Sequence, residues 1–458
     1  MPSQTASRHA PPGSDPRRQH ASPTAPAGAG QAVPSGHSAP GDVTVRLRPR
    51  PGLLGPVRLV QLILVEAVAA AALIGWAHGR MALIAGGLLG VLLLVPVVLR
   101  LGGLSLADNL RARAALRRRI RRAALAPHGP DVDPVLTPVL ECEPALRVVT
   151  HSIEADGGVG RRERREIGMV GDGTFLSALI QVEAPDRPLR PHPGAVPLAL
   201  TLLAQGLRAD DIVLDSVQLV QYAQPAPAPH LPEQALAARA YRELPSGAST
   251  PGLRLTWVAV RLDPELCRSA VAARGGGESG ARKALQRAVD QLASRLIETG
   301  LRATVLDAAQ ITAAIGTAVC PNPVAVTHGR GAAGSVDGGA PRRTAETAKS
   351  WRCDDRWHRS YWIGQWPRLN PQSTPELVNL LTGTPALGSS FALTLREAGT
   401  GAVALSGHVR ITARGESELT TAARQLETRA RSAGAGLVRL ELEQVPGVLA
   451  TLPLGGTC

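Results

Sequence analysis

Two acidic residues near residue 130 form the motif best suited to chemistry. Asp131 and Asp133 make a DxD pair, the pattern with which nucleotide-sugar transferases hold a divalent metal. Carboxylate oxygens are ligands that such metals prefer. The pair follows a Gly-Pro step and precedes Pro134, which is typical of a loop. The motif is the one feature of the sequence that favours a glycosyltransferase.

A second cluster places four metal-type donors within six residues. The donors are Cys353, Asp354, Asp355 and His358. Their spacing is not that of a zinc site, and no second ligand pair lies nearby in the sequence. The glycine-rich stretch 275–283 does not form a phosphate loop, because Ala281 and Arg282 stand where Lys and Ser or Thr are required. With no GxSxG or HExxH motif either, the sequence predicts no catalytic residue, no cofactor and no metal site.

The composition narrows the classes of partner. The 458 residues carry a net charge of +13, but sixteen arginines and only four carboxylates lie in residues 1–130, so the basic character is local. Aromatic residues make up 2 %, too few for the stacking platforms of single-stranded nucleic-acid binders. The five cysteines stand singly, which argues against a disulfide scaffold. No nucleic-acid partner is expected.

The N-terminal part has the pattern of a membrane anchor. Residues 1–45 are rich in Pro, Ser, Ala and Gly and are predicted to be a disordered tail. Residues 46–100 are predicted to form a transmembrane hairpin with spans at 59–77 and 81–99, each close to the ~20 residues that cross a bilayer. Glu66 in the first span, and Gly86 and Gly90 in the second, are predicted to contact other membrane helices.

Arginines flank the predicted hairpin on its open side, while its tip offers only Arg80. This bias predicts a multi-pass membrane protein with both termini in the cytoplasm. Residues 101–130 are predicted to hold a basic juxtamembrane helix from Leu106 to Leu125. We expect its arginines to meet anionic lipid headgroups, with contact to a partner helix as the alternative role. They are Arg111, Arg113, Arg117, Arg118, Arg119, Arg121 and Arg122.

The remainder is predicted to be a cytosolic α+β region. Residues 131–324 and 350–458 each alternate between strand and helix patterns in the order β-α-β-β-α-β, and residues 325–349 have the composition of a linker. The predicted first unit holds strands at 174–182, 212–222, 253–262 and 303–306. The predicted second unit holds strands at 361–366, 391–397, 403–413 and 437–443. The apolar run 445–456 is expected to pack irregularly on the domain surface or under a partner.

Four of the six tryptophans fall within sixteen residues. In a chain this poor in aromatics, such a cluster indicates either a packed core or an interface. The core is the first interpretation, and the interface with a partner is the second. The four candidates for that interface are Trp351, Trp357, Trp362 and Trp366.

The order of these segments resembles EccE, a membrane component of the type VII (ESX) secretion system. The closest local matches are the stretch from Arg58 to Glu66, Ile167–Val170 followed by Asp172-Gly173, and the ending Thr451–Gly456. The resemblance covers roughly residues 50–458. It implies assembly with EccB-, EccC- and EccD-like components in one inner-membrane complex. In that family the motor ATPase is EccC, and EccE carries no established catalytic centre.

The sequence therefore favours a non-catalytic scaffold that stabilises a type VII secretion complex. A membrane-anchored enzyme such as a glycosyltransferase, built on the DxD pair, is the alternative. A peripheral regulator held at the membrane by its basic helix is a third hypothesis.

Overall fold

The computed structural model describes the chain in long stretches from residue 104 onward, and at short or single positions before that. The long stretches are 104–124, 132–156, 162–185, 198–226, 252–332, 342–368, 373–399 and 402–456, with a few positions in 234–240 and Asn370. Apart from Val45, the predicted tail 1–45 lies outside the described residues. Val43–Cys458 forms one compact unit.

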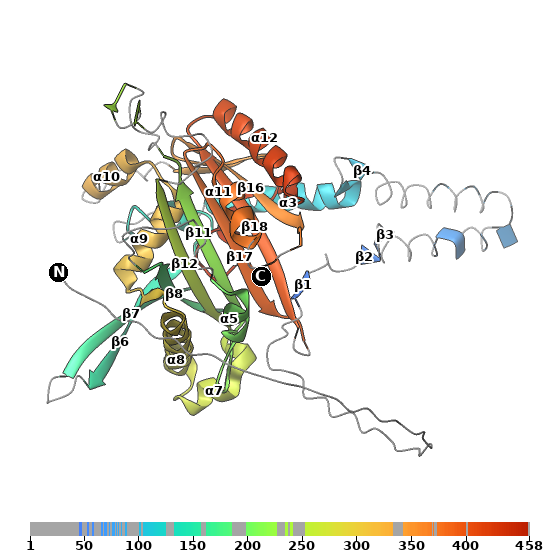
Figure 1. Cartoon of the computed structure of the whole chain (residues 1–458). Coiled ribbons are helices and arrows are strands. Elements are labelled where there is room, and N and C mark those ends of the chain that lie inside the picture. The colour runs from blue at the N-terminus through green and yellow to red at the C-terminus, as the bar shows by residue number, and fades with distance from the viewer. Residues whose placement is uncertain are drawn as a thin grey trace, which may run out of the picture. The chain divides into compact units, whose positions relative to one another are not determined.

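One large antiparallel sheet organises this unit (Figure 1). Its long strands lie in the order β16 (Arg356–Gln365), β18 (Val403–Ala413), β17 (Gly388–Glu397), β11 (Ser216–Gln224), β12 (Leu253–Leu262) and β8 (Leu176–Glu183). Further strands continue the sheet at each end. They are β15 (Trp351–Cys353) and β14 (Thr344–Glu346) beyond β16, and β7 (Arg162–Gly171) and β6 (Arg147–Asp156) beyond β8.

The predicted β-α-β-β-α-β order occurs twice in this sheet. The first half is β8, α5 (Leu200–Gln205), β11, β12, α8 (Gly277–Glu298) and β13 (Arg302–Val305). The second half is β16, α11 (Ser373–Thr382), β17, β18, α12 (Glu416–Ser432) and β19 (Gly436–Arg439). In each half the first strand lies between the third and the fourth, which is the split-βαβ arrangement. The mixed α+β class is confirmed.

The two halves share one continuous sheet because β11 pairs with β17. The pairing is antiparallel and runs from Val217 opposite Leu395 to Ala223 opposite Ser389. Every backbone donor and acceptor at this seam can therefore pair, and neither half ends in an open edge there. The strands predicted for two units thus form a single structural body.

Both faces of the sheet are buried, so its central strands are apolar on both sides. On β12, Val258 and Val260 face one core with α8 and α12, while Trp257 and Ala259 face a second core. The second core is covered by α4 (Thr137–Leu140), α9 (Ala308–Val319) and α13 (Gln444–Ala450). A two-sided core of this kind explains why the strands read as nearly continuous hydrophobic runs.

Several elements differ from the sequence-based expectation. The predicted linker 325–349 contains most of α10 (Pro323–Ala332) and all of β14. The hairpin β6–β7 and the helix α9, whose N-terminus is closed by a capping box between Asp307 and Gln310, were not predicted. Smaller elements of the described part are α7 (Arg268–Ala273), the 3-10 helix Pro264–Cys267, and the short strands β1 (Val45–Leu47), β2 (Leu53–Leu54), β3 (Val57–Arg58), β4 (Arg100–Leu101), β5 (Leu104–Ser105), β9 (Arg208–Ala209) and β10 (Ile212–Val213).

The C-terminal segment is part of the core rather than a loose surface run. Leu452 and Leu454 are buried, and polar side chains from three strands hold the backbone around them. Ser177 Oγ donates to Leu454 O (2.9 Å), and Arg261 Nη1 donates to Gly456 O (2.7 Å). The segment runs so close to the sheet that a Cβ at Gly455 would lie 2.5 Å from Arg261 Cβ, so only glycine fits there.

Gln218 is the central contact of this segment, and its loss tests how firmly the segment is held. Its side chain donates to Ala450 O (2.8 Å) and accepts from Gly455 N (2.8 Å) in a buried site. Gln218→Leu leaves both backbone groups unpaired, so we expect the free energy of unfolding to fall by about 2–4 kcal/mol in urea titration. Gln221→Leu, the same change on the same strand, is the control and should cost under about 1 kcal/mol. Equal effects of the two substitutions would contradict this role.

Two histidines whose pKa values are lowered by the fold predict a loss of stability in mild acid. Burial, with Arg410 and Arg356 nearby, holds the pKa of His358 well below its ordinary value, and burial lowers the pKa of His408 to about 4. Both imidazoles are therefore neutral in the folded protein, whereas the unfolded chain takes up protons near pH ~6.5. Stability is then constant above about pH 6.5 and falls as the pH drops toward about 4.

The urea midpoint should accordingly fall between about pH 7 and pH 5. His408→Gln should reduce that fall, while His328→Gln, at an exposed position of α10, should leave it unchanged. A midpoint independent of pH in the unsubstituted protein would contradict the assignment.

Candidate functional site

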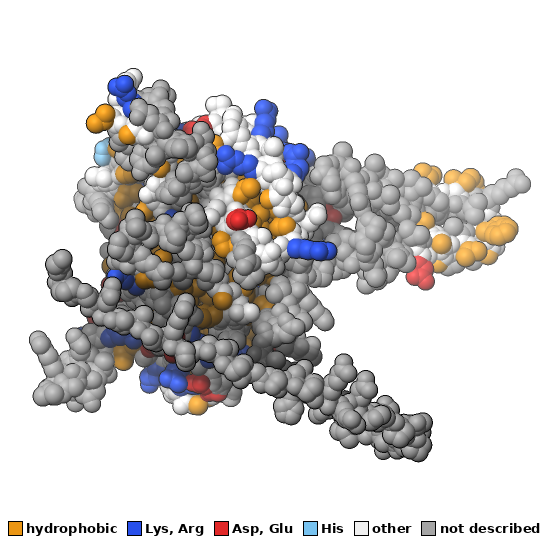
Figure 2. Space-filling model, in the orientation of Figure 1, with side chains coloured by type: hydrophobic (Ala, Val, Ile, Leu, Met, Phe, Trp, Pro, Cys, Tyr) orange, Lys and Arg blue, Asp and Glu red, His pale blue; other side chains and the backbone are white. Residues whose placement is uncertain are grey.

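Of the three residues predicted for contacts within the membrane, the structure describes one. Glu66 is helical and exposed, and Gly86 and Gly90 lie outside the described residues. Within the described part of the chain, no helix is both long and apolar enough to cross a membrane. The predicted spans 59–77 and 81–99 themselves fall mostly outside that part. The described large apolar side chains of these spans are exposed by 57–82 %: Leu73, Trp76, Met81, Ile84 and Leu88. Figure 2 shows exposed hydrophobic side chains in orange toward its right-hand end.

The predicted juxtamembrane helix is present as α3 (Leu106–Ala123). Its arginines divide between two faces. Arg111, Arg113, Arg117, Arg118, Arg121 and Arg122 are exposed. Arg119 is only half-exposed and shares a face with Ala115, Leu116 and the buried Ala123, at the three- and four-residue spacing of a helix. That face points toward β14, so Arg119 differs in role from the other six.

Arg119 is bonded to the sheet domain by a bidentate ion pair. Its Nε and Nη2 donate to the two carboxylate oxygens of Glu346, both at 2.9 Å. The same Nη2 donates to Leu442 O (2.5 Å). The Glu346 side chain is only 2 % exposed, so this pair is shielded from solvent far better than an ordinary surface pair.

Glu346 joins three separate segments of the chain at its carboxylate. Besides Arg119, it accepts a hydrogen bond from Val445 N (2.9 Å), at the start of α13. Leu442, whose carbonyl accepts from Arg119, adopts a left-handed backbone with φ +66°. Its N–H donates to Ala348 O (2.7 Å). A left-handed leucine costs on the order of 1–2 kcal/mol, so the surrounding bonds must hold this turn in place. We call α3, β14 and the turn 440–445, with the bonds among them, the β14 junction.

A second buried carboxylate fixes the other end of β14. Glu141 accepts from Thr344 N (2.8 Å), from Thr344 Oγ1 (2.6 Å) and from Arg343 N (2.9 Å). Arg343 in turn forms an ion pair with Asp354 at 2.8 Å. Glu141 and Glu346 therefore hold the three-residue strand β14 in place. The strand connects the segments that precede the sheet with the sheet itself.

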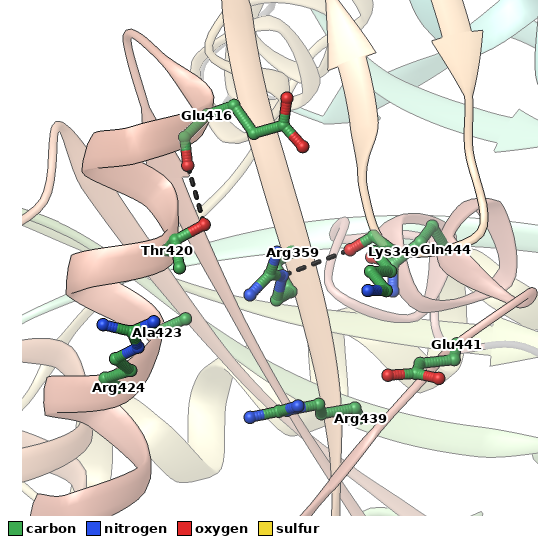
Figure 3. Close-up of a pocket in the computed structure, with 9 residues that line it drawn as sticks. All are labelled: Lys349, Arg359, Glu416, Thr420, Ala423, Arg424, Arg439, Glu441 and Gln444. Atoms are coloured by element: carbon green, nitrogen blue, oxygen red, sulfur yellow. Dashed lines mark hydrogen bonds between the residues drawn. The ribbon is translucent and has the colours of Figure 1, made fainter. Parts of the chain in front are cut away.

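A polar pocket of about 250 Å³ lies beside this junction (Figure 3). It occurs where β16 lacks a continuous neighbour, because β15 pairs with residues 356–358 and β19 with residues 361–365. At the gap, Ser360 N donates to the Gln444 side chain (3.0 Å) in place of a strand partner. The lining residues are Lys349, Arg359, Glu416, Thr420, Ala423, Arg424, Arg439, Glu441 and Gln444.

Four cations from four different elements line the pocket. Arg439 is already neutralised, because it binds Glu427 through two hydrogen bonds of 2.7 and 2.8 Å. The Arg439 side chain lowers the pKa of Glu427, and both Tyr361 and Arg439 keep that carboxylate ionised. Burial raises the pKa of Tyr361, whose hydroxyl donates to Glu427 (3.0 Å). One cation of the pocket, Arg439, is thus neutralised by Glu427. The three further cations are Lys349, Arg359 and Arg424.

The tryptophan cluster divides between core and surface. Trp351 is buried in the second core with its ring 4.8 Å from that of His358, so it cannot meet a partner in this structure. Trp357 and Trp366 pack partly against the first core, and Trp362 is half-exposed on β16. An interface through the three partly exposed tryptophans stays a prediction.

The donors that suggested metal sites serve the fold instead. Asp354 binds Arg343, while His358 Nδ1 lies 2.9 Å from Thr412 Oγ1 in the interior. Asp133 accepts from Val135 N (2.9 Å) within its own turn, and Asp131 lies outside the described residues. In the described ranges, no group of three or more His, Cys, Asp or Glu side chains could hold a metal ion.

Comparison with known proteins agrees with the resemblance seen in the sequence. Residues 250–363 match the family model described as "Putative type VII ESX secretion system translocon, EccE". The predicted resemblance to EccE is therefore confirmed over this stretch, which runs from β12 through β14 and β15 into β16 and includes Glu346. No curated protein matches the chain.

Among solved structures, an alkyldihydroxyacetonephosphate synthase matches with a TM-score of 0.23 and 8 % sequence identity. The match covers 60 % of this chain and 42 % of that one. Similarity at this level carries no argument about fold or activity.

Removal of Arg119 tests the β14 junction directly. Arg119→Gln leaves the buried Glu346 without its cation, so we expect α3 to detach and its backbone amides to exchange hydrogen at least about tenfold faster. Arg118→Gln, the same change one residue away on the exposed face, should leave exchange within about twofold of the unsubstituted chain. Hydrogen exchange of residues 106–124 read by mass spectrometry makes the comparison, and identical protection in the two variants would contradict the junction.

Proposed function

We propose that this protein is a membrane-held, non-catalytic scaffold subunit of a type VII secretion translocon. The observation that carries the proposal is the β14 junction, which binds the basic helix α3 to the sheet domain that contains the EccE-like stretch. A subunit built in this way keeps its basic helix attached to its sheet domain, and this role requires no catalytic centre. EccB-, EccC- and EccD-like membrane components are the proposed partners.

Two features support a place at the membrane. Large apolar side chains are exposed at the described helical positions of residues 66–88, where an apolar environment would stabilise them. Six arginines then follow on the exposed face of α3, within reach of anionic headgroups at about 1 kcal/mol each. The proposal keeps the predicted spans, with both termini in the cytoplasm of a multi-pass inner-membrane protein.

Purification of the assembled complex tests the proposed function. The tag belongs at the N-terminus, because residues 452–456 are buried against the sheet. From membranes solubilised in mild detergent, the full-length chain should elute with a membrane ATPase and a polytopic partner in one large particle, read by native gel and mass spectrometry. Arg119→Gln should lower the yield of that particle several-fold, while Arg118→Gln should not.

A lone monomer or a small homo-oligomer, recovered in several detergents, would contradict the scaffold. If that occurs, binding of a nucleotide sugar and a divalent metal at Asp131 and Asp133 becomes the measurement for the alternative function.

A further inference from the structure

The pocket beside the β14 junction is lined by three cations that form no salt bridge within the described part of the chain. Lys349 comes from the turn between β14 and β15, Arg359 from β16 and Arg424 from α12. Figure 3 shows Arg359 between the α12 side chains on one side and Lys349 and Gln444 on the other. Among the described residues, none of the three cations forms an ion pair. Arg439, on the same pocket, shows the contrast, because Glu427 binds it bidentately.

The pocket is built to keep its shape. Arg359 Nε donates to Lys349 O (3.2 Å), so the arginine is fixed to the opposite wall by its inner nitrogen. Gln444 is 1 % exposed and forms the floor, with its amide donating to Leu440 O (2.7 Å) and accepting from Ser360 N. A preformed cavity with fixed polar groups is the usual form of a binding site.

The charges in the pocket select a class of ligand. Three cations without a salt bridge among the described residues favour an anion, but Glu416 and Glu441 also line the cavity and would repel a dense polyphosphate. A polypeptide segment with one or two carboxylates fits this pattern better, because its carboxylates can meet the guanidinium groups while its backbone N–H groups meet the glutamates. We propose that this pocket binds an acidic segment of a partner polypeptide.

The same walls connect the pocket to α3. Lys349 follows Ala348, whose carbonyl accepts from Leu442 N, and Glu441 precedes Leu442, whose carbonyl accepts from Arg119. A segment held between Lys349 and Arg359 therefore stabilises the turn that holds Arg119. The proposal rests on the proposed function in one respect, that the ligand belongs to a partner subunit. It adds that docking of that subunit tightens the attachment of the juxtamembrane helix.

A labelled peptide tests the pocket on the purified full-length chain in detergent, without other subunits. The probe is fluorescein-labelled Gly-Ser-Asp-Glu-Asp-Glu-Ser-Gly at about 0.15 M salt, and its Asn/Gln counterpart is the neutral control. We expect saturable binding by fluorescence anisotropy, with a dissociation constant below about 1 mM. Arg424→Gln should weaken the binding about threefold to tenfold, and the double variant with Arg359→Gln and Arg424→Gln should weaken it further. Arg431→Gln, an exposed arginine on the same helix outside the pocket, should leave the affinity unchanged.

Three results would overturn the proposal. They are no saturable binding, equal weakening by Arg431→Gln and Arg424→Gln, and displacement of the peptide by stoichiometric tripolyphosphate, which would assign the pocket to phosphate ligands. Slower hydrogen exchange of residues 106–124 on peptide addition is the expected sign of coupling, and unchanged exchange would overturn that part. Because the assay uses the isolated chain, failure here leaves co-purification intact, and failure of co-purification leaves peptide binding measurable.

Discussion

The buried carboxylate of Glu346 is the constraint on which the arrangement of this protein depends. A carboxylate that is 2 % exposed must be paired and hydrogen-bonded, and Glu346 meets that requirement only by drawing in Arg119 from α3 and the backbone of Val445. Glu141 satisfies the same requirement at the other end of β14. A strand of three residues thereby connects the helix that follows the apolar stretch, the edge of the sheet and the turn before α13.

This arrangement explains why a binding pocket and an anchoring helix can act together. The gap between β15 and β19 opens the pocket, and the turn 440–445 forms part of both the pocket wall and the junction. A left-handed Leu442 at the centre of that turn keeps its conformation only while its neighbours hold it. The proposed docking of an acidic segment and the proposed attachment of α3 therefore depend on the same few bonds, within the sheet domain that carries the EccE-like stretch.

Local patterns in the sequence predicted much of the sheet, and long-range pairing accounts for what they missed. Alternation and apolar runs predicted strands that match β12 at Leu253–Leu262 and β18 at Val403–Ala413. The hairpin β6–β7 was missed because charged side chains such as Arg164 and Glu166 cover its projecting part. Strand β14 was missed because the hydrogen bonds of Glu141 and Glu346 stabilise its three residues, and no local alternation of apolar and polar residues marks it. The candidate site could not be predicted from the sequence, because Arg119 and Glu346 are 227 residues apart. In its local sequence, Arg119 is one of seven similar arginines.

A double-mutant cycle on Arg119 and Glu346 is the most direct test of the β14 junction. Unfolding free energies of the unsubstituted chain, Arg119→Met, Glu346→Gln and the double variant give the coupling energy between the two side chains. We expect a coupling of at least about 1.5 kcal/mol, because the pair is bidentate and shielded, and under about 0.5 kcal/mol for the exposed pair of Arg287 and Asp210 measured in the same way. A coupling between Arg119 and Glu346 no larger than that of the exposed pair would contradict this expectation.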